Sequence, residues 1–158
     1  MPRTALNLKA LAAATLIAIG GVSATPAMAI AAPEVYLPPF SKVALSGYDP
    51  VSYFVGGTPR KGDARFSMTF KGVDYRFATP ENLARFRSNP QAFLPQYGGY
   101  CAWAVAGGYT AKGDPLAWKI VGGKLYLNYN AEIQGRWNKD IPGFIAKGNT
   151  NWPKVLEK

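Results

Sequence analysis

The sequence predicts one small α+β domain made of two duplicated units, each a β-hairpin followed by a helix. Two pairs of short segments with alternating apolar residues are joined by glycine-containing two-residue turns, Lys71-Gly72 and Gly122-Gly123. A segment with helix-start residues follows each pair. The turn glycines Gly72 and Gly123 lie 51 positions apart, and the residues around them recur in the same order. We interpret this recurrence as an internal duplication, because one such unit is too small to bury a core alone.

The first unit covers about residues 64–95. Residues 64–70 alternate, which places Phe66, Met68 and Phe70 on one face of a strand. Residues 73–77 alternate again after the Lys71-Gly72 turn. A helix is expected next, because Thr79 can cap the free amides, Pro80 is tolerated at the first helical position, and Glu81 complements the helix dipole.

The second unit covers about residues 116–146 and repeats this order. Residues 117–121 and 124–129 form the predicted hairpin, and Asn130 caps the predicted helix. A shift of 51 positions superposes Tyr75 on Tyr126 and Thr79 on Asn130. We expect the two units to pack against each other through four apolar helix residues. These are Leu83, Phe86, Ile133 and Trp137.

Residues 1–29 resemble a secretory signal peptide. The segment begins with the basic residues Arg3 and Lys9, continues with an apolar run, and ends in the small-x-small site Ala27-Met28-Ala29. The apolar stretch of about 15 residues is shorter than the roughly 20 that span a bilayer, which favours a cleaved signal peptide. A retained membrane anchor is the alternative. The sequence therefore predicts a periplasmic or secreted protein. Residues 30–42 are predicted to be an extended, proline-rich arm, and residues 43–158 the domain itself.

The composition excludes several kinds of catalytic and metal site. The 158 residues include no histidine and one cysteine, which removes Ser-His-Asp triads, Cys-His dyads, histidine-bound zinc and an intrachain disulfide. The acidic residues show no spacing that would pair two carboxylates for acid–base catalysis. We therefore predict that the protein is not an enzyme.

Basic residues outnumber acidic ones, with 18 Lys and Arg against 9 Asp and Glu, yet they are scattered along the chain. A scattered basic charge is typical of a solvated surface, with attraction to anionic lipid or envelope polymers as the alternative. Export would remove nucleic acid as a partner. The predicted partners are an envelope protein or a small ligand, and a homodimer remains an alternative.

Four motifs resemble the YHS domain family over about residues 45–95. They are Asp49-Pro50-Val51, Phe70-Lys71-Gly72-x-x-Tyr75-x-Phe77, Arg85-Phe86 and Asn89-Pro90-x-x-Phe93-Leu94. The segments 96–104 and 151–153 resemble the exported, single-domain branch of that family. The resemblance implies an α+β fold and an association with metal handling. Metal-linked members carry cysteines after Asp-Pro-Val and in a Phe-Cys-Ser-x-x-Cys segment, whereas this chain has Ser52, Ala78 and Asn82 there.

Cys101 and Met68 are the candidate metal ligands. A thiolate and a thioether together suit Cu(I), so the sequence suggests a copper-handling protein of the cell envelope. The alternative is that Cys101 is a small buried apolar residue, the usual state of an unpaired cysteine. A redox role for Cys101 would need a lowered pKa, and no histidine is present to lower it.

A group of aromatic residues suggests a second function. Tyr97, Tyr100, Trp103 and Tyr109 cluster in the sequence where the two predicted units meet. A concave site between two subdomains is a common place for ligand binding, so these side chains are candidate ligand-binding residues. The alternative function is thus a metal-free module that binds a small ligand or a protein in the periplasm. The other interpretation of these rings is that they belong to the core.

Overall fold

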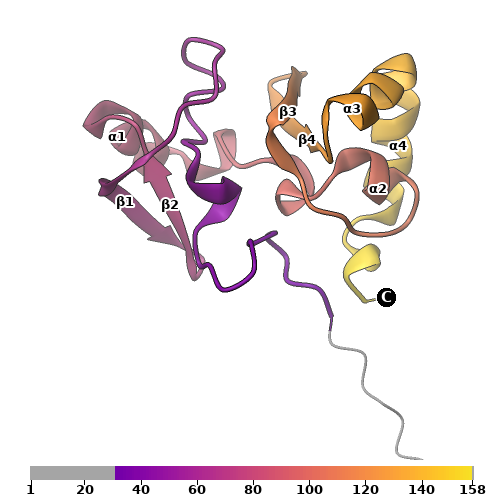
Figure 1. The fold of residues 1–158 in the computed structure, drawn as a ribbon, viewed down its shortest axis with the longest axis horizontal. Helices are drawn as coiled ribbons and strands as arrows, with labels where there is room; N and C mark the ends of the chain where they lie inside the picture. Colours follow the sequence, from indigo (N-terminus) through magenta and orange to yellow (C-terminus); the bar gives the residue numbers. More distant parts are fainter. Residues whose placement is uncertain (1–30, 158) are drawn as a thin grey trace, which may run out of the picture.

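The computed structural model describes residues 31–157, which form a small α+β fold with two separate antiparallel sheets of two strands each (Figure 1). Each sheet belongs to one half of the molecule, and the two halves lie side by side. The predicted signal peptide lies outside the described residues. Within residues 31–157, none of the helices combines the length and the apolar character needed to cross a membrane.

The first half contains the hairpin β1 (Asp63–Phe70) and β2 (Val73–Phe77), followed by α1 (Pro80–Ser88). The predicted cap is present, because the Thr79 side chain accepts a hydrogen bond from the Asn82 backbone N–H at 3.1 Å. The short 3-10 helix η1 (Ala44–Gly47) precedes the hairpin, and η2 (Pro90–Ala92) follows α1. The prediction of a strand pair and a capped helix is confirmed here.

The second half repeats the order with β3 (Asp114–Val121), β4 (Lys124–Asn128) and α3 (Ala131–Trp137). The Asn130 side chain caps α3 by accepting a hydrogen bond from the Ile133 N–H at 2.8 Å. This half also contains further helices: η3 (Gln96–Gly99), α2 (Ala102–Ala106), η4 (Asn138–Asp140), α4 (Ile141–Asn151) and η5 (Lys154–Glu157). Helix α4 packs against α2 and gives this half an extra layer.

The two hairpins have the same register. Asp63 pairs with Phe77 and Asp114 with Asn128, and each pairing is followed by an irregularity at the same place in the strand. Left-handed backbone conformations also occur at corresponding points before each hairpin, at Leu45 and Ser46 and at Tyr97 and Gly98. The elements therefore recur in the order that the sequence predicts, whereas an origin by duplication remains a hypothesis.

The predicted packing of the units through α1 and α3 is wrong, because each helix covers its own core. Phe86 lies in one buried cluster with Val51 and Phe77, whereas Trp137 lies in a second cluster with Tyr126. The halves meet instead along β4. Successive side chains of a strand point to opposite faces, so Leu125 and Leu127 enter the first cluster and Tyr126 enters the second. The hydroxyl of Tyr53 donates a hydrogen bond to the Pro115 carbonyl at 2.9 Å and adds a second link.

The N-terminal arm belongs to the compact structure, although the sequence suggested that compact structure begins near Val43. The arm crosses from the second half to the first (Figure 1). The Ala32 N–H donates to the Leu156 carbonyl at 2.7 Å, and the Tyr36 N–H donates to the Gly98 carbonyl at 2.9 Å. Gly98 permits this close passage, because a Cβ there would overlap the carbonyl oxygen of Glu34.

Candidate functional site

A pocket of about 390 Å³ lies where the arm passes between the two halves. This volume falls within the range of roughly 300–1,000 Å³ that is usual for small-molecule sites. The arm, the turn between β1 and β2, the connection from η2 to η3 and the residue after α4 all contribute to its lining. The lining residues are Pro33, Glu34, Val35, Phe70, Lys71, Val73, Tyr75, Gln91, Leu94, Pro95, Gln96, Tyr97, Gly98 and Trp152.

Apolar and aromatic side chains from both halves contribute to the pocket wall together with polar groups. Val73 and Tyr75 are two positions apart on β2, so strand alternation places them on the same face. Phe70 precedes the hairpin turn on the first half, and Tyr97 and Trp152 contribute from the second half. The rings of Tyr97 and Trp152 lie 5.8 Å apart, centroid to centroid. These two rings are therefore packed against each other and can present an aromatic surface to a bound molecule.

The hydroxyl of Tyr75 is one of the polar groups that line the pocket without a hydrogen-bond partner. Tyr75 is only 3% exposed and lines the pocket, yet its hydroxyl has no hydrogen-bond partner among the described residues. Burial, together with the negative charge of Glu34, raises its pKa to about 12, so the phenol is neutral near pH 7. The Tyr97 hydroxyl differs, because it already contacts the Asn149 Oδ1 at 2.9 Å.

Two exposed charges of opposite sign border the pocket. Glu34 comes from the arm and Lys71 from the β1–β2 turn. Neither forms an ion pair within residues 31–157. The Lys71 ammonium lies 5.7 Å from the centroid of the Phe70 ring. Both charges are thus available to a bound molecule.

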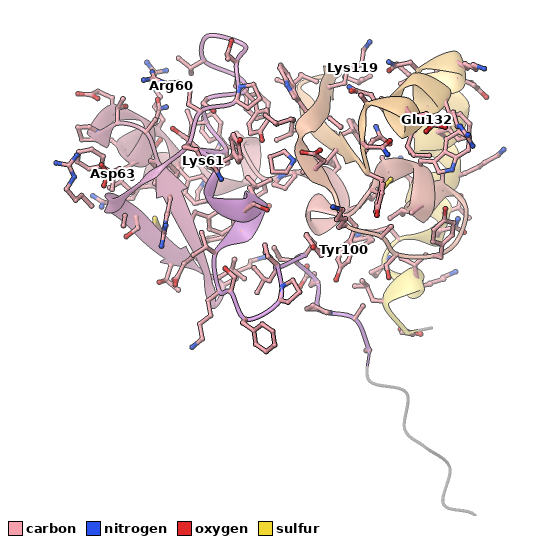
Figure 2. The ribbon with its side chains drawn as sticks, viewed as in Figure 1. Arg60, Lys61, Asp63, Tyr100, Lys119 and Glu132 are labelled. Carbon is pink, nitrogen blue, oxygen red and sulfur yellow. The ribbon has the colours of Figure 1, made fainter. Side chains whose placement is uncertain are left out.

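The four aromatic residues that the sequence proposed for ligand binding do not form one site. Tyr97 lines the pocket, but Tyr100 is buried beside it and donates a hydrogen bond to the Pro33 carbonyl at 2.8 Å (Figure 2). Trp103 packs on Phe144, with ring centroids 4.7 Å apart. Tyr109 is exposed. Of the four residues, Tyr97 alone is in the lining of this pocket, and ligand binding by any of them stays a prediction.

The pocket residues that the sequence analysis missed come from the arm, from β2 and from the C-terminal segment. Glu34, Tyr75 and Trp152 are far apart in the sequence, and the segment that contains Glu34 was predicted only as an extended arm before the domain. The sequence identifies Tyr75 as a strand residue and as part of a recurring motif, but not as a pocket residue. Its alternation with Val73 did indicate a shared face, but no pattern in the sequence showed that this face would open onto a pocket.

Cys101 and Met68, the candidate metal ligands, lie in different halves. Met68 is on β1, where it pairs with Tyr75 across the hairpin, and β1 is on the opposite side of the molecule from α2, which follows Cys101 (Figure 1). Cys101 is 1% exposed, and its thiol lies 3.8 Å from the Asn128 Oδ1. Burial raises the pKa of the thiol, against a smaller opposing effect of nearby backbone amides. Within residues 31–157, no group of three Cys, Asp or Glu side chains could hold a metal ion.

Ser52, Ala78 and Asn82 all form hydrogen bonds with one buried residue, Asp49. Asp49 is fully buried, and its Oδ2 accepts hydrogen bonds from the Ala78 N–H at 2.8 Å and the Asn82 Nδ2 at 2.7 Å. The Ser52 hydroxyl donates to the Asp49 backbone carbonyl at 2.7 Å. The Asp49 Oδ1 accepts a hydrogen bond from the Val51 N–H at 2.8 Å. These donors satisfy the carboxylate without a cation, as buried charges require.

The basic side chains are distributed over both halves. Figure 2 shows Arg60 and Lys61 on the first half and Lys119 on the second.

Comparison of the chain with protein-family models, with curated proteins and with solved structures gives no match.

Proposed function

We propose that this protein is a non-enzymatic binding module of the cell envelope, which holds a small ligand in the pocket between its two halves. The observation that carries the proposal is the pocket of about 390 Å³, whose lining includes Tyr75, a residue with no hydrogen-bond partner for its hydroxyl among the described residues. Enclosed apolar walls with a few polar groups are the usual features of a small-molecule site. The segments that build it come from both halves and from the arm, so ligand binding would link all three.

The geometry favours this function over the handling of copper. A Cu(I) site needs soft ligands that converge, and the structure places the thiol and the thioether in different halves. Cys101 is also buried, so a metal ion would have to open the second core to reach it.

Kinship with the YHS family, export and duplication form part of the same proposal. The convergence of Ser52, Ala78 and Asn82 on Asp49 supports the kinship, because the family's cysteines must also converge to share an ion.

Export rests on the signal-peptide pattern of residues 1–29. Intact-mass analysis should find a mature chain that begins at Ile30, and recovery of the uncleaved chain from membranes would contradict this expectation.

A neutral aromatic probe tests the binding function. Naphthylmethanol should bind the protein with one saturable site, as measured by isothermal titration calorimetry. Leu94→Trp should abolish this binding, because the larger side chain fills the pocket that Leu94 lines. Leu116→Trp is the matched control, because Leu116 is 62% exposed and does not line the pocket. Equal binding by both variants, or no binding by the unmodified protein, would contradict the proposal.

A further inference from the structure

Tyr75 and Glu34 both contribute polar groups to the lining of the pocket. The Tyr75 hydroxyl has no hydrogen-bond partner within residues 31–157, and the negative charge of Glu34 acts on it strongly enough to contribute to its raised pKa. A neutral phenol offers one donor and an acceptor oxygen, whereas a carboxylate only accepts. A ligand group that donates several hydrogen bonds and carries a positive charge would satisfy both residues at once.

The positive charge of Lys71 is less able to direct a ligand. Solvent and salt screen the charge of the exposed Glu34 and, equally, that of the exposed Lys71. Its ammonium already lies near the Phe70 ring, at 5.7 Å from the centroid. The Glu34 carboxylate, in contrast, has no ion-pair or hydrogen-bond partner among the described residues. The polar lining of the pocket therefore favours a cation over an anion, although the whole chain is basic.

The aromatic walls favour the same kind of ligand. Phe70, Tyr97 and Trp152 line the pocket, and the negative faces of such rings attract organic cations. Val35, Val73 and Leu94 complete the wall with aliphatic surface. This combination fits a molecule with an apolar body and a positively charged head.

We infer that the ligand is an organic amine, whose protonated nitrogen binds between the Glu34 carboxylate and the Tyr75 hydroxyl and whose apolar part lies against Phe70, Tyr97 and Trp152. This inference rests on the proposed binding function and adds the chemical class of the ligand. Apart from Tyr97, it concerns residues that the sequence does not identify as candidates for ligand binding.

Three probes that share one ring system test the inference by calorimetry. Naphthylmethylamine carries a positive charge at pH 7, naphthylmethanol is neutral, and naphthoate is negative. The amine should bind at least about tenfold more tightly than the alcohol, the effect expected of one charge-assisted hydrogen bond. The carboxylate should bind most weakly.

Two variants of the bordering charges form a matched pair. Glu34→Gln should weaken binding of the amine about tenfold and leave binding of the alcohol unchanged. Lys71→Gln, which removes the other exposed charge, should not weaken binding of the amine. Tyr75→Phe should weaken the amine several-fold, and its thermal unfolding should show that the protein remains folded.

The outcomes separate this inference from the function on which it rests. Equal affinity for the amine and the alcohol would overturn the amine class and leave the binding function standing. If naphthoate bound most tightly of the three probes and Lys71→Gln lost this binding, the amine class would also be overturned. Failure of all three probes to bind would overturn both proposals. An amine affinity that Glu34→Gln does not change would overturn the assigned position of the cation.

Discussion

Asp49 in the first half and Cys101 in the second occupy corresponding places in the fold. Each follows a short left-handed turn, and the residue before each forms a β-bridge, Tyr48 with Lys61 and Tyr100 with Lys112. Asp49 lies beside Ala78, the residue after β2, and Cys101 lies beside Tyr129, the residue after β4. The Ala78 N–H donates to Asp49, and the backbone amide of Tyr129 lies close enough to Cys101 to lower the pKa of its thiol.

The groups in these two places differ in charge. Asp49 accepts hydrogen bonds from two backbone amides and from Asn82, so the first half encloses a satisfied carboxylate. The second half encloses a neutral thiol beside the buried Asn128, whose Nδ2 has no acceptor among the described residues. One backbone arrangement thus holds an anion in one half and a small neutral group in the other. The Asp49 carboxylate is part of the local fold, whereas Cys101 mainly fills space.

The largest expected effects concern the two cores. Phe86→Ala and Trp137→Ala should each lower the free energy of unfolding by about 3–5 kcal/mol, because both side chains are fully buried. Chemical denaturation monitored by circular dichroism would measure this.

The milder pair Phe86→Leu and Trp137→Phe tests whether the cores are separate. Their effects should add in the double variant, because the two residues belong to different buried clusters. A coupling energy well above about 0.5 kcal/mol would indicate that α1 and α3 pack together after all.

Asp49 should be more important for stability than Cys101. Asp49→Ala should cost about 3 kcal/mol, because it leaves three donors without their acceptor in the core. Cys101→Ala removes a small neutral group, and about 1 kcal/mol is expected. The same denaturation experiment compares the two variants. Equal losses would show that the carboxylate has no special role in the first half.

The sequence was sufficient to predict the hairpins, the capped helices and their recurrence, because turn glycines and caps act locally. Thr79 and Asn130 are recognisable as caps from their neighbours alone. The sequence did not show that β4 would lie between two cores, since that depends on which face each of Leu125, Tyr126 and Leu127 presents. The pocket was equally hidden, because its lining combines the arm with residues far along the chain.

Alkaline pH should destabilise both halves. Burial raises the pKa of Tyr53 and Tyr75 in the first half and of Tyr97, Tyr100 and Tyr126 in the second. Above pH 10 the unfolded chain loses phenolic protons that the folded chain keeps, so the free energy of unfolding falls as pH rises. Each such tyrosine contributes up to about 1.4 kcal/mol per pH unit.

Phenylalanine variants assign this pH dependence to single residues. The pKa of Tyr75 in the folded protein is about 12, so the contribution of its protonated phenol to the free energy of unfolding is lost between pH 10 and pH 12. Denaturation at pH 9, 10 and 11 should give a shallower decline for Tyr75→Phe than for the unmodified protein. Tyr109→Phe is the control, because Tyr109 is 52% exposed. An identical decline in both variants would show that burial of Tyr75 does not protect its proton.

The smallest expected effect is that of Cys101 on copper. Cys101→Ser keeps a small donor beside the Asn128 Oδ1 and should cost about 1 kcal/mol of stability or less. In competition with a Cu(I) chelator, the unmodified protein and the variant should retain equally little copper, because the thiol is buried and burial raises its pKa. Ellman's reagent should modify Cys101 slowly in the folded protein and rapidly after unfolding, for the same reason. If the unmodified protein retained copper and Cys101→Ser did not, Cys101 would be a functional group and not merely a side chain that fills space. Asp49 would keep its structural role.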